Sequence, residues 1–332
     1  MAFQNYSLKG YNENCNWQLE LILQVLPDLV QGLKSVESLS SHLKIADFGC
    51  SEGKNSVIMF KQLLESFRIE SQTPVHVFHT DLPENNWSVF NRIIANPEFS
   101  YLSLPNTYFS TIGRSFYNQL FASNSIHLAC SFFSFHYLST KPIRELGDST
   151  FPHQAFIKQS QSDIRNLIRL RLEELVTGGL LFFTVVGTGD TPNMNMGNIL
   201  MTSLMKLLEQ GVFSQEDMRN LEWNTFSLSL NDYGNIAKEF QDIAQVEGLS
   251  EFKGVSPDYV EYMENKDIDK YVEKLTGFYF TIMELQVYSI LPETTSKSEA
   301  ALKLKEAISD VIRQNPEKEM YLNTIKLSMR KL

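Results

Sequence analysis

The chain has few cysteines, no long apolar run and fewer basic than acidic residues, and each shortage excludes a class of protein. Cys15, Cys50 and Cys130 form no C-x-x-C pair, so the sequence indicates neither a disulfide scaffold nor a cysteine zinc site. The longest apolar run, 180–187, is much shorter than the roughly 18–20 residues that a membrane helix needs. We therefore expect no membrane partner and no bound metal.

The charge balance argues against a nucleic-acid partner. The chain has 29 basic and 39 acidic residues, which gives a net charge of -10. A surface this negative repels phosphate backbones unless a local basic patch overrides it.

The first residues show no basic start followed by an apolar segment, so no secretory signal is visible. We expect a cytoplasmic protein.

Strand-like and helix-like segments alternate over the first 186 residues. Strand-like segments that alternate with helix-like segments of this length predict parallel βαβ units, and therefore an α/β fold with a mostly parallel sheet. The apolar segments typical of strands are 44–48, 75–78, 125–131 and 180–186. The segments with apolar residues at helical spacing are 56–67, 87–95 and 156–176, the last ending at Gly178 and Gly179.

Beyond residue 187 the pattern is looser. Residues 199–210 and 298–313 have helical spacing, with Ser298 as a cap, whereas 321–330 alternates with period two and predicts a last strand. We therefore expect an α/β core over 1–188 and 276–332, interrupted by inserted helical cap segments over about 189–275.

The loop after the first strand has the composition of a ligand-binding turn. Gly49 and Gly53 let the backbone pass close to a ligand, and Asp47 and Asp81 lie at the ends of neighbouring strands. An acid at such a strand end suits a ribose diol. Neither GxGxxG nor GxxxxGK[ST] is present, so no pyrophosphate loop is indicated. S-adenosylmethionine (SAM) fits this pattern, although an ordinary strand-to-helix turn would also show it.

Longer motifs narrow the choice. The segment IADFGCSEGKN (45–55) resembles the IADLGCSSGPN motif of the SABATH family, which includes salicylate, benzoate and theobromine methyltransferases. Four further segments resemble the family in the same order: KG at 9–10, DLPENN at 81–86, GRSFYNQLF at 113–121 and SFFSFHYLS at 131–139. The resemblance implies a SAM-dependent methyltransferase fold, a Rossmann-like core with a helical cap, and methyl transfer to a small carboxylic acid.

The resemblance also implies a set of cofactor-binding residues. The N-terminal lysine would close its segment over SAM, the glycine loop would surround the cofactor, and the next two motifs would hold its ribose and adenine. The residues at these positions are Lys9, Asp47, Gly49, Cys50, Asn55, Asp81, Leu82, Ser115 and Phe116.

Four residues would position the acceptor: Gln24, Phe133, His136 and Tyr137. Two of them depart from the family, which usually has tyrosine at the position of Phe133 and tryptophan at that of Tyr137. An indole only donates a hydrogen bond, whereas a phenol donates or accepts. These departures leave room for a substrate other than the family's benzenoid acids.

Methyl transfer to a carboxylate needs no general base, because an acid with a pKa near 4 is already ionised at neutral pH. Catalysis would then come mainly from positioning. Two alternatives remain: an N- or O-methyltransferase of a heteroaromatic or phenol, with His136 as the base, and a non-catalytic protein that still binds SAM. We also expect a homodimer.

Overall fold

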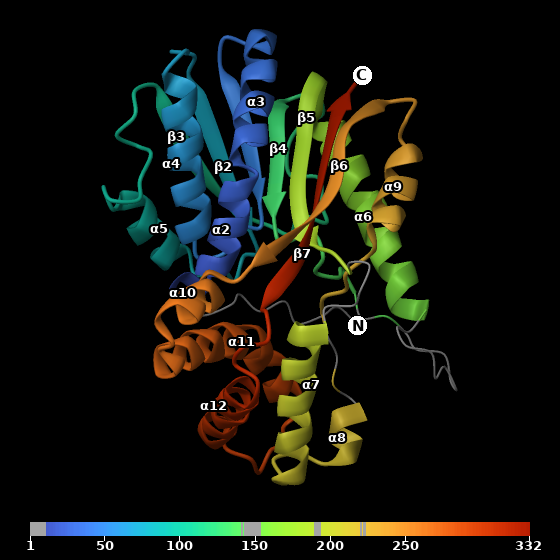
Figure 1. Ribbon diagram of the computed structural model, residues 1–332. Coiled ribbons are helices and arrows are strands. Elements are labelled where there is room, and N and C mark those ends of the chain that lie inside the picture. Colours follow the sequence, from blue (N-terminus) through green and yellow to red (C-terminus); the bar gives the residue numbers. More distant parts are fainter. Residues whose placement is uncertain (1–10, 141, 143–153, 189–193, 220, 222–223) are drawn as a thin grey trace.

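The computed structural model describes residues 11–140, 142, 154–188, 194–219, 221 and 224–332. In this part of the chain, seven strands form one sheet in the order β3-β2-β1-β4-β5-β7-β6 (Figure 1). The first five pair in parallel, and β7 is antiparallel to both of its neighbours. The strands are β1 (Leu43–Phe48), β2 (Val75–Asp81), β3 (Thr107–Gly113), β4 (Ile126–Phe132), β5 (Leu175–Val186), β6 (Ala244–Val255) and β7 (Tyr321–Lys331).

Helices cover both faces of this sheet, as the burial of both faces of its central strands requires. Ile45 of β1 packs in one core and its neighbour Ala46 in the other, and Phe182 and Phe183 of β5 are divided in the same way. The first core includes α3 (Leu26–Val36) and α4 (Lys54–Arg68), and the second includes α6 (Gln154–Glu174) and α9 (Leu230–Lys238). A central strand buried on both faces is mostly apolar, and in β5 the residues 180–186 are apolar except for the buried Thr184.

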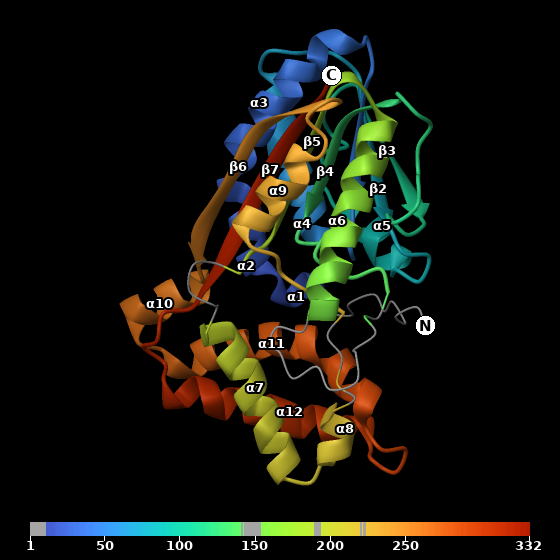
Figure 2. The same ribbon diagram turned by 90° about the vertical axis from the view of Figure 1, so that its right-hand side faces the viewer.

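A second group of helices lies across the carboxyl ends of the parallel strands (Figures 1 and 2). It consists of α7 (Met194–Glu209), α8 (Gln215–Arg219), α10 (Pro257–Asn265), α11 (Ile268–Ile290) and α12 (Lys297–Gln314). The other helices are α1 (Tyr11–Asn14), α2 (Asn16–Gln24) and α5 (Trp87–Ala95), with a short 3₁₀ turn at Glu37–Leu39. The α/β fold with a helical cap is therefore confirmed. None of the described helices is long and apolar enough to cross a membrane.

The arrangement differs from the expected boundaries of the cap. β6 and α9, inside the interval 189–275, belong to the sheet and its cover, whereas α12, outside that interval, packs with both α7 and α11. β6 shows no regular period-two pattern in the sequence, because its pairing register with β7 shifts between Val246 and Gly248. β3 was not expected either, since its burial is only partial.

Two expected helix ends also move. α6 ends at Glu174, and Gly178, with a φ of +80°, lies inside β5 instead of stopping the helix. α12 begins at Lys297, so its N-cap residue is Ser296, which lies two residues before the cap expected at Ser298. Helix ends are the least determined part of a sequence pattern, because they depend on local backbone geometry.

Candidate functional site

The loop between β1 and α4 follows a path that requires glycine. Gly49 has a φ of +85°, and a Cβ there would lie 2.3 Å from Oγ of Ser134. The loop is fixed to β2, because the N–H groups of Gly49 and Cys50 donate to the carbonyl of Thr80 at 2.8 and 3.1 Å. Gly53, at φ +96°, directly precedes α4. A substituted residue at position 49 would therefore need both a disfavoured backbone conformation and displacement of Ser134.

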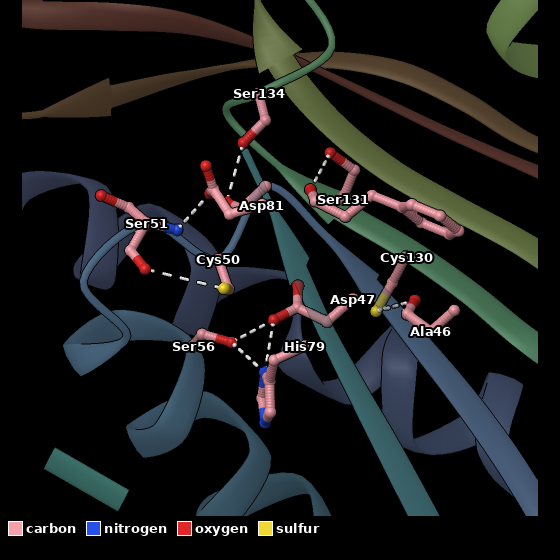
Figure 3. A network of polar contacts seen from close by, with 12 residues as sticks. Ala46, Asp47, Cys50, Ser51, Ser56, His79, Asp81, Cys130, Ser131 and Ser134 are labelled. Atoms are coloured by element: carbon pink, nitrogen blue, oxygen red, sulfur yellow. Dashed lines mark hydrogen bonds and ion pairs between the residues drawn. The ribbon is translucent and has the colours of Figure 1, made fainter. Parts of the chain in front are cut away.

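Asp81 lies at the end of β2 and faces this loop (Figure 3). Its Oδ2 accepts a hydrogen bond from the N–H of Ser51 at 2.6 Å, and its Oδ1 accepts from the N–H of Leu82 at 2.8 Å. Burial is the main cause that raises the pKa of this carboxyl to about 6, against the lowering effect of the two N–H donors. Both donors fix the carboxylate at the edge where parallel strands end.

Asp47, the acid at the end of β1, has a different environment. Its Oδ2 accepts a hydrogen bond from the hydroxyl of Ser56 and lies 2.8 Å from Nδ1 of His79 (Figure 3). The other ring nitrogen of His79 lies 2.7 Å from the hydroxyl of Tyr101. Because Asp47 and His79 are buried, this network connects β1, β2 and α4 from inside. Asp47 thus orders the loop as well as lining the cavity described next.

One cavity of about 320 Å³ runs from this loop toward the helical cap. Its wall includes most of the residues that the sequence singled out, although they come from four separate motifs. Those in the wall are Asp47, Gly49, Cys50, Asn55, Asp81, Leu82, Ser115, Phe116, Phe133, His136 and Tyr137. Lys9 lies outside the described residues.

Helix α1 is attached to the glycine loop. Asn12 accepts from the N–H of Lys54 at 3.1 Å and donates its side-chain amide to the carbonyl of Glu52 at 3.2 Å. Asn55 donates to the carbonyl of Cys15 at 2.9 Å. The amide of Asn55 therefore connects the loop to the start of α2, which is a structural role that its motif alone did not reveal.

The structure does not bring Gln24 to the cavity. Gln24 is exposed at the end of α2, whereas Gln18, one and two-thirds turns earlier, is 8% exposed and lies in the cavity wall. Six residues of α-helix rotate a side chain by about 600°, which places the two glutamines on different faces. The Oε1 of Gln18 is buried and has no hydrogen-bond partner among the described residues. Of these two glutamines, Gln18 is therefore the one that can contact a ligand in the cavity.

The segment after β4 carries the three other expected acceptor residues. Phe133 has a φ of +55°, which turns the chain at the strand end. Burial alone lowers the pKa of His136 to about 4, and burial is the main cause that raises the pKa of Tyr137 to about 12. Both side chains are therefore uncharged at neutral pH, and Nδ1 of His136 is buried without a partner in the described part of the chain.

Several cavity residues were missed because no motif marks them. They are Tyr11 and Gln18 from the N-terminal helices, Asn224 and Thr225 from the segment before α9, and Phe278, Ile282 and Gln286 from α11. The one signal available was the spacing of four on α11, which puts three residues on one helix face.

No lysine or arginine belongs to the cavity wall among the described residues. In the same residues, no three His, Cys, Asp or Glu side chains are grouped so that they could hold a metal ion. A negatively charged group bound here would therefore depend on neutral donors of the protein and on the charge of a second ligand.

Comparisons with known proteins agree with this geometry. The model of a family described as SAM-dependent carboxyl methyltransferase matches residues 7–314. A salicylate/benzoate carboxyl methyltransferase of Arabidopsis thaliana is 23% identical in an alignment 290 residues long, which covers 78% of this chain and 75% of that protein. A loganic acid O-methyltransferase of Catharanthus roseus is 29% identical, over 70% of this chain and 71% of its own.

The fold has a close counterpart among solved structures. A loganic acid methyltransferase with SAH superposes with a TM-score of 0.79 and 22% identity, covering 97% of this chain and 96% of the other. The family match covers nearly the whole chain, including the glycine loop, Asp81 and the helical cap. The chain therefore belongs to the SABATH family of SAM-dependent carboxyl methyltransferases, enzymes that methylate small acids.

Proposed function

We propose that this enzyme forms a methyl ester on a small organic acid held by Gln18, His136 and Tyr137, and that no protein group acts as a base. The observation that carries this proposal is the position of His136 in the cavity wall, where its Nδ1 is buried without a partner among the described residues and burial lowers its pKa to about 4. An imidazole with this pKa is a poor proton acceptor for a phenol or an amine. A carboxylic acid is already ionised at neutral pH and has no proton to remove.

The end of the cavity lined by Gln18, His136 and Tyr137, which we call the acceptor end because the methyl acceptor would bind there, carries no charged side chain among these three residues and supports the same proposal. Tyr137 stays protonated at neutral pH, so its hydroxyl donates to a carboxylate oxygen, and the amide N–H of Gln18 provides a second donor. When bound, SAM supplies a methyl group on a positively charged sulfur. Because the described wall has no lysine or arginine, that charge is the counter-charge for the acid in this partly apolar cavity.

We assign the cofactor to the end of the cavity formed by the glycine loop. The carboxylate of Asp81, held by two N–H donors, is placed to accept from the hydroxyls of a ribose. Gly49 allows the close approach that a ligand needs there. The other residues that we propose around the cofactor are Asp47, Cys50, Asn55, Leu82, Ser115 and Phe116. The role of Lys9 stays a prediction from the family motif.

The alternatives have weaker support. An N- or O-methyltransferase would need a group able to accept a proton near pH 7, and burial makes His136 unsuited to this. A non-catalytic protein that only binds SAM would have no need of the polar side chains of Gln18, His136 and Tyr137 in the cavity wall.

A labelled-methyl assay tests the proposal. Purified protein is given SAM with a labelled methyl group and panels of aromatic, terpenoid and fatty acids, and each product is identified by base-labile release of the label. We expect ester formation with at least one panel, and binding of S-adenosylhomocysteine by calorimetry. Binding of S-adenosylhomocysteine without turnover of any acid would instead indicate the non-catalytic protein.

Two further properties stay predictions. We propose a cytoplasmic location, which the three buried free cysteines support, because free thiols are typical of reducing compartments. We also propose a homodimer, for which light scattering after gel filtration is the direct measurement.

A further inference from the structure

The wall that α11 contributes to the cavity changes from apolar to polar along the helix. Phe278, Ile282 and Gln286 all line the cavity and lie on one helix face, since they are four residues apart. The ring of Phe278 is 5.2 Å from that of Trp17, the neighbour of Gln18. Eight residues of helix rise about 12 Å, so Gln286 lies well away from the end of this wall next to Gln18.

The amide of Gln286 is fixed in one orientation. Its Nε2 donates to Oδ1 of Asn224 at 3.1 Å, so its oxygen is turned away from Asn224. That oxygen, Oε1, is buried and has no hydrogen-bond partner among the described residues. A buried carbonyl oxygen without a donor is unfavourable, and Gln286 belongs to the cavity wall, so a ligand that displaces the atoms covering this oxygen can satisfy it.

Asn224 is connected to the segment that holds the acid. The N–H of Leu138 donates to the carbonyl of Asn224 at 2.7 Å, and the N–H of Phe226 donates to the carbonyl of His136 at 2.9 Å. This antiparallel pairing fixes the polar site at Gln286 relative to Tyr137, which lies between the two paired residues. The cavity therefore has two polar sites at a set separation, with the apolar side chain of Ile282 next to the second.

We propose that the acid methylated by this enzyme carries a hydroxyl group remote from its carboxylate, and that this hydroxyl donates its hydrogen bond to Oε1 of Gln286. The inference rests on the proposed function, since it takes the carboxylate to be held by Gln18 and Tyr137. A site built to bind a hydroxyl rejects an analogue that lacks it, because the buried partner is then left unpaired.

Matched acids test this inference. The probes are 4-hydroxybenzoate and 3-(4-hydroxyphenyl)propanoate, each compared with analogues in which methyl or methoxy replaces the hydroxyl. Methyl is close in size but makes no hydrogen bond, and methoxy only accepts. For at least one series we expect the wild-type enzyme to prefer the hydroxylated acid by about tenfold or more in kcat/KM. Calorimetry with S-adenosylhomocysteine present should show the same preference in binding.

Two variants assign the preference to one side chain. Gln286→Met keeps the approximate size but removes the acceptor oxygen, so it should lose the preference while still esterifying the methyl analogue. Ser289→Ala, at an exposed position on the same helix, should keep the preference.

The outcomes separate this inference from the proposed function. Ester formation without a hydroxyl preference in either series overturns the inference alone, as does a preference that survives in Gln286→Met. If no acid is esterified and none binds, the proposed function and the inference both fail. If Gln286→Met does not fold, the wild-type comparison still overturns the inference when neither series shows a hydroxyl preference.

Discussion

The guanidinium of Arg171 and the carboxylate of Glu174 form an ion pair at 2.8 Å inside the protein, and neither side chain is exposed. Arg171 also donates to the carbonyls of Phe116 and Asn118, at 3.0 and 2.9 Å. Glu174 accepts from the N–H of Phe121 at 3.1 Å. One buried pair on α6 therefore fixes the loop after β3, which carries part of the proposed cofactor site.

Removal of this pair should be costly. We expect Arg171→Met to lower the free energy of unfolding by about 3–5 kcal/mol, because it leaves the carboxylate of Glu174 buried without its partner. Arg165→Met is the control on the same helix, where the pair with Glu239 is about half exposed and should contribute less than about 1 kcal/mol. Urea unfolding followed by circular dichroism measures both, and equal losses would contradict the assigned role.

The charge of Asp81 should control cofactor affinity. Asp81→Ala removes the acceptor of the proposed ribose hydrogen bonds, so we expect S-adenosylhomocysteine to bind about 1–3 kcal/mol more weakly. Asp242→Ala, at an exposed position away from the cavity, should bind it normally. Calorimetry gives both constants, and an unchanged affinity in Asp81→Ala would exclude the ribose assignment.

The same carboxyl should make stability depend on pH. Its pKa is raised to about 6, so between roughly pH 4 and 6 the folded protein keeps a proton that the unfolded chain releases. By linkage, stability falls as pH rises through this window. Asp81→Asn, which cannot ionise, should therefore be more stable than the wild type at pH 7.5, and the difference should shrink as pH falls to 4. Urea unfolding at several pH values checks this, and a constant difference would show that Asp81 is not the group responsible.

Gln18 and Gln24 form a matched pair on one short helix. We expect Gln18→Ala to raise KM for the acid by about tenfold or more, because it removes a donor from the proposed carboxylate site. Gln24→Ala should behave as the wild type, since that side chain is exposed. Steady-state kinetics with saturating SAM distinguishes the two variants. A larger effect of Gln24→Ala would indicate that Gln24 contacts the substrate, as expected from the sequence.

The pH dependence of turnover tests the role of His136. With SAM and the acid both saturating, kcat should stay flat between pH 6 and 8, because His136 titrates near pH 4 and a carboxylate needs no base. His136→Asn, which keeps an N–H donor, should retain much of the turnover. A limb near pH 6.5 that disappears in His136→Asn, with the fold intact, would instead indicate methylation of a nitrogen or phenol.

The sequence alone determined the fold class, and it also predicted the residues that we propose for the cofactor end of the site. Apolar runs such as 180–186 and helical spacing such as 56–67 depend on local periodicity, so they predict the strands and helices of the core directly. The glycine loop and Asp81 are also local signals, since consecutive residues build the turn and the strand end. The SABATH resemblance followed from these same contiguous segments.

Only the tertiary structure decided which residues we propose for the acceptor end. The choice between Gln18 and Gln24 depends on which face of α2 packs on the core. The spacing of the family motif does not specify how the helix is rotated about its axis. Gln286 and Asn224 are 62 residues apart, and their pairing depends on how α11 packs across the sheet. The low pKa of His136 is likewise a consequence of burial by side chains from other segments. Such properties arise from contacts between distant parts of the chain, which no single stretch of sequence specifies.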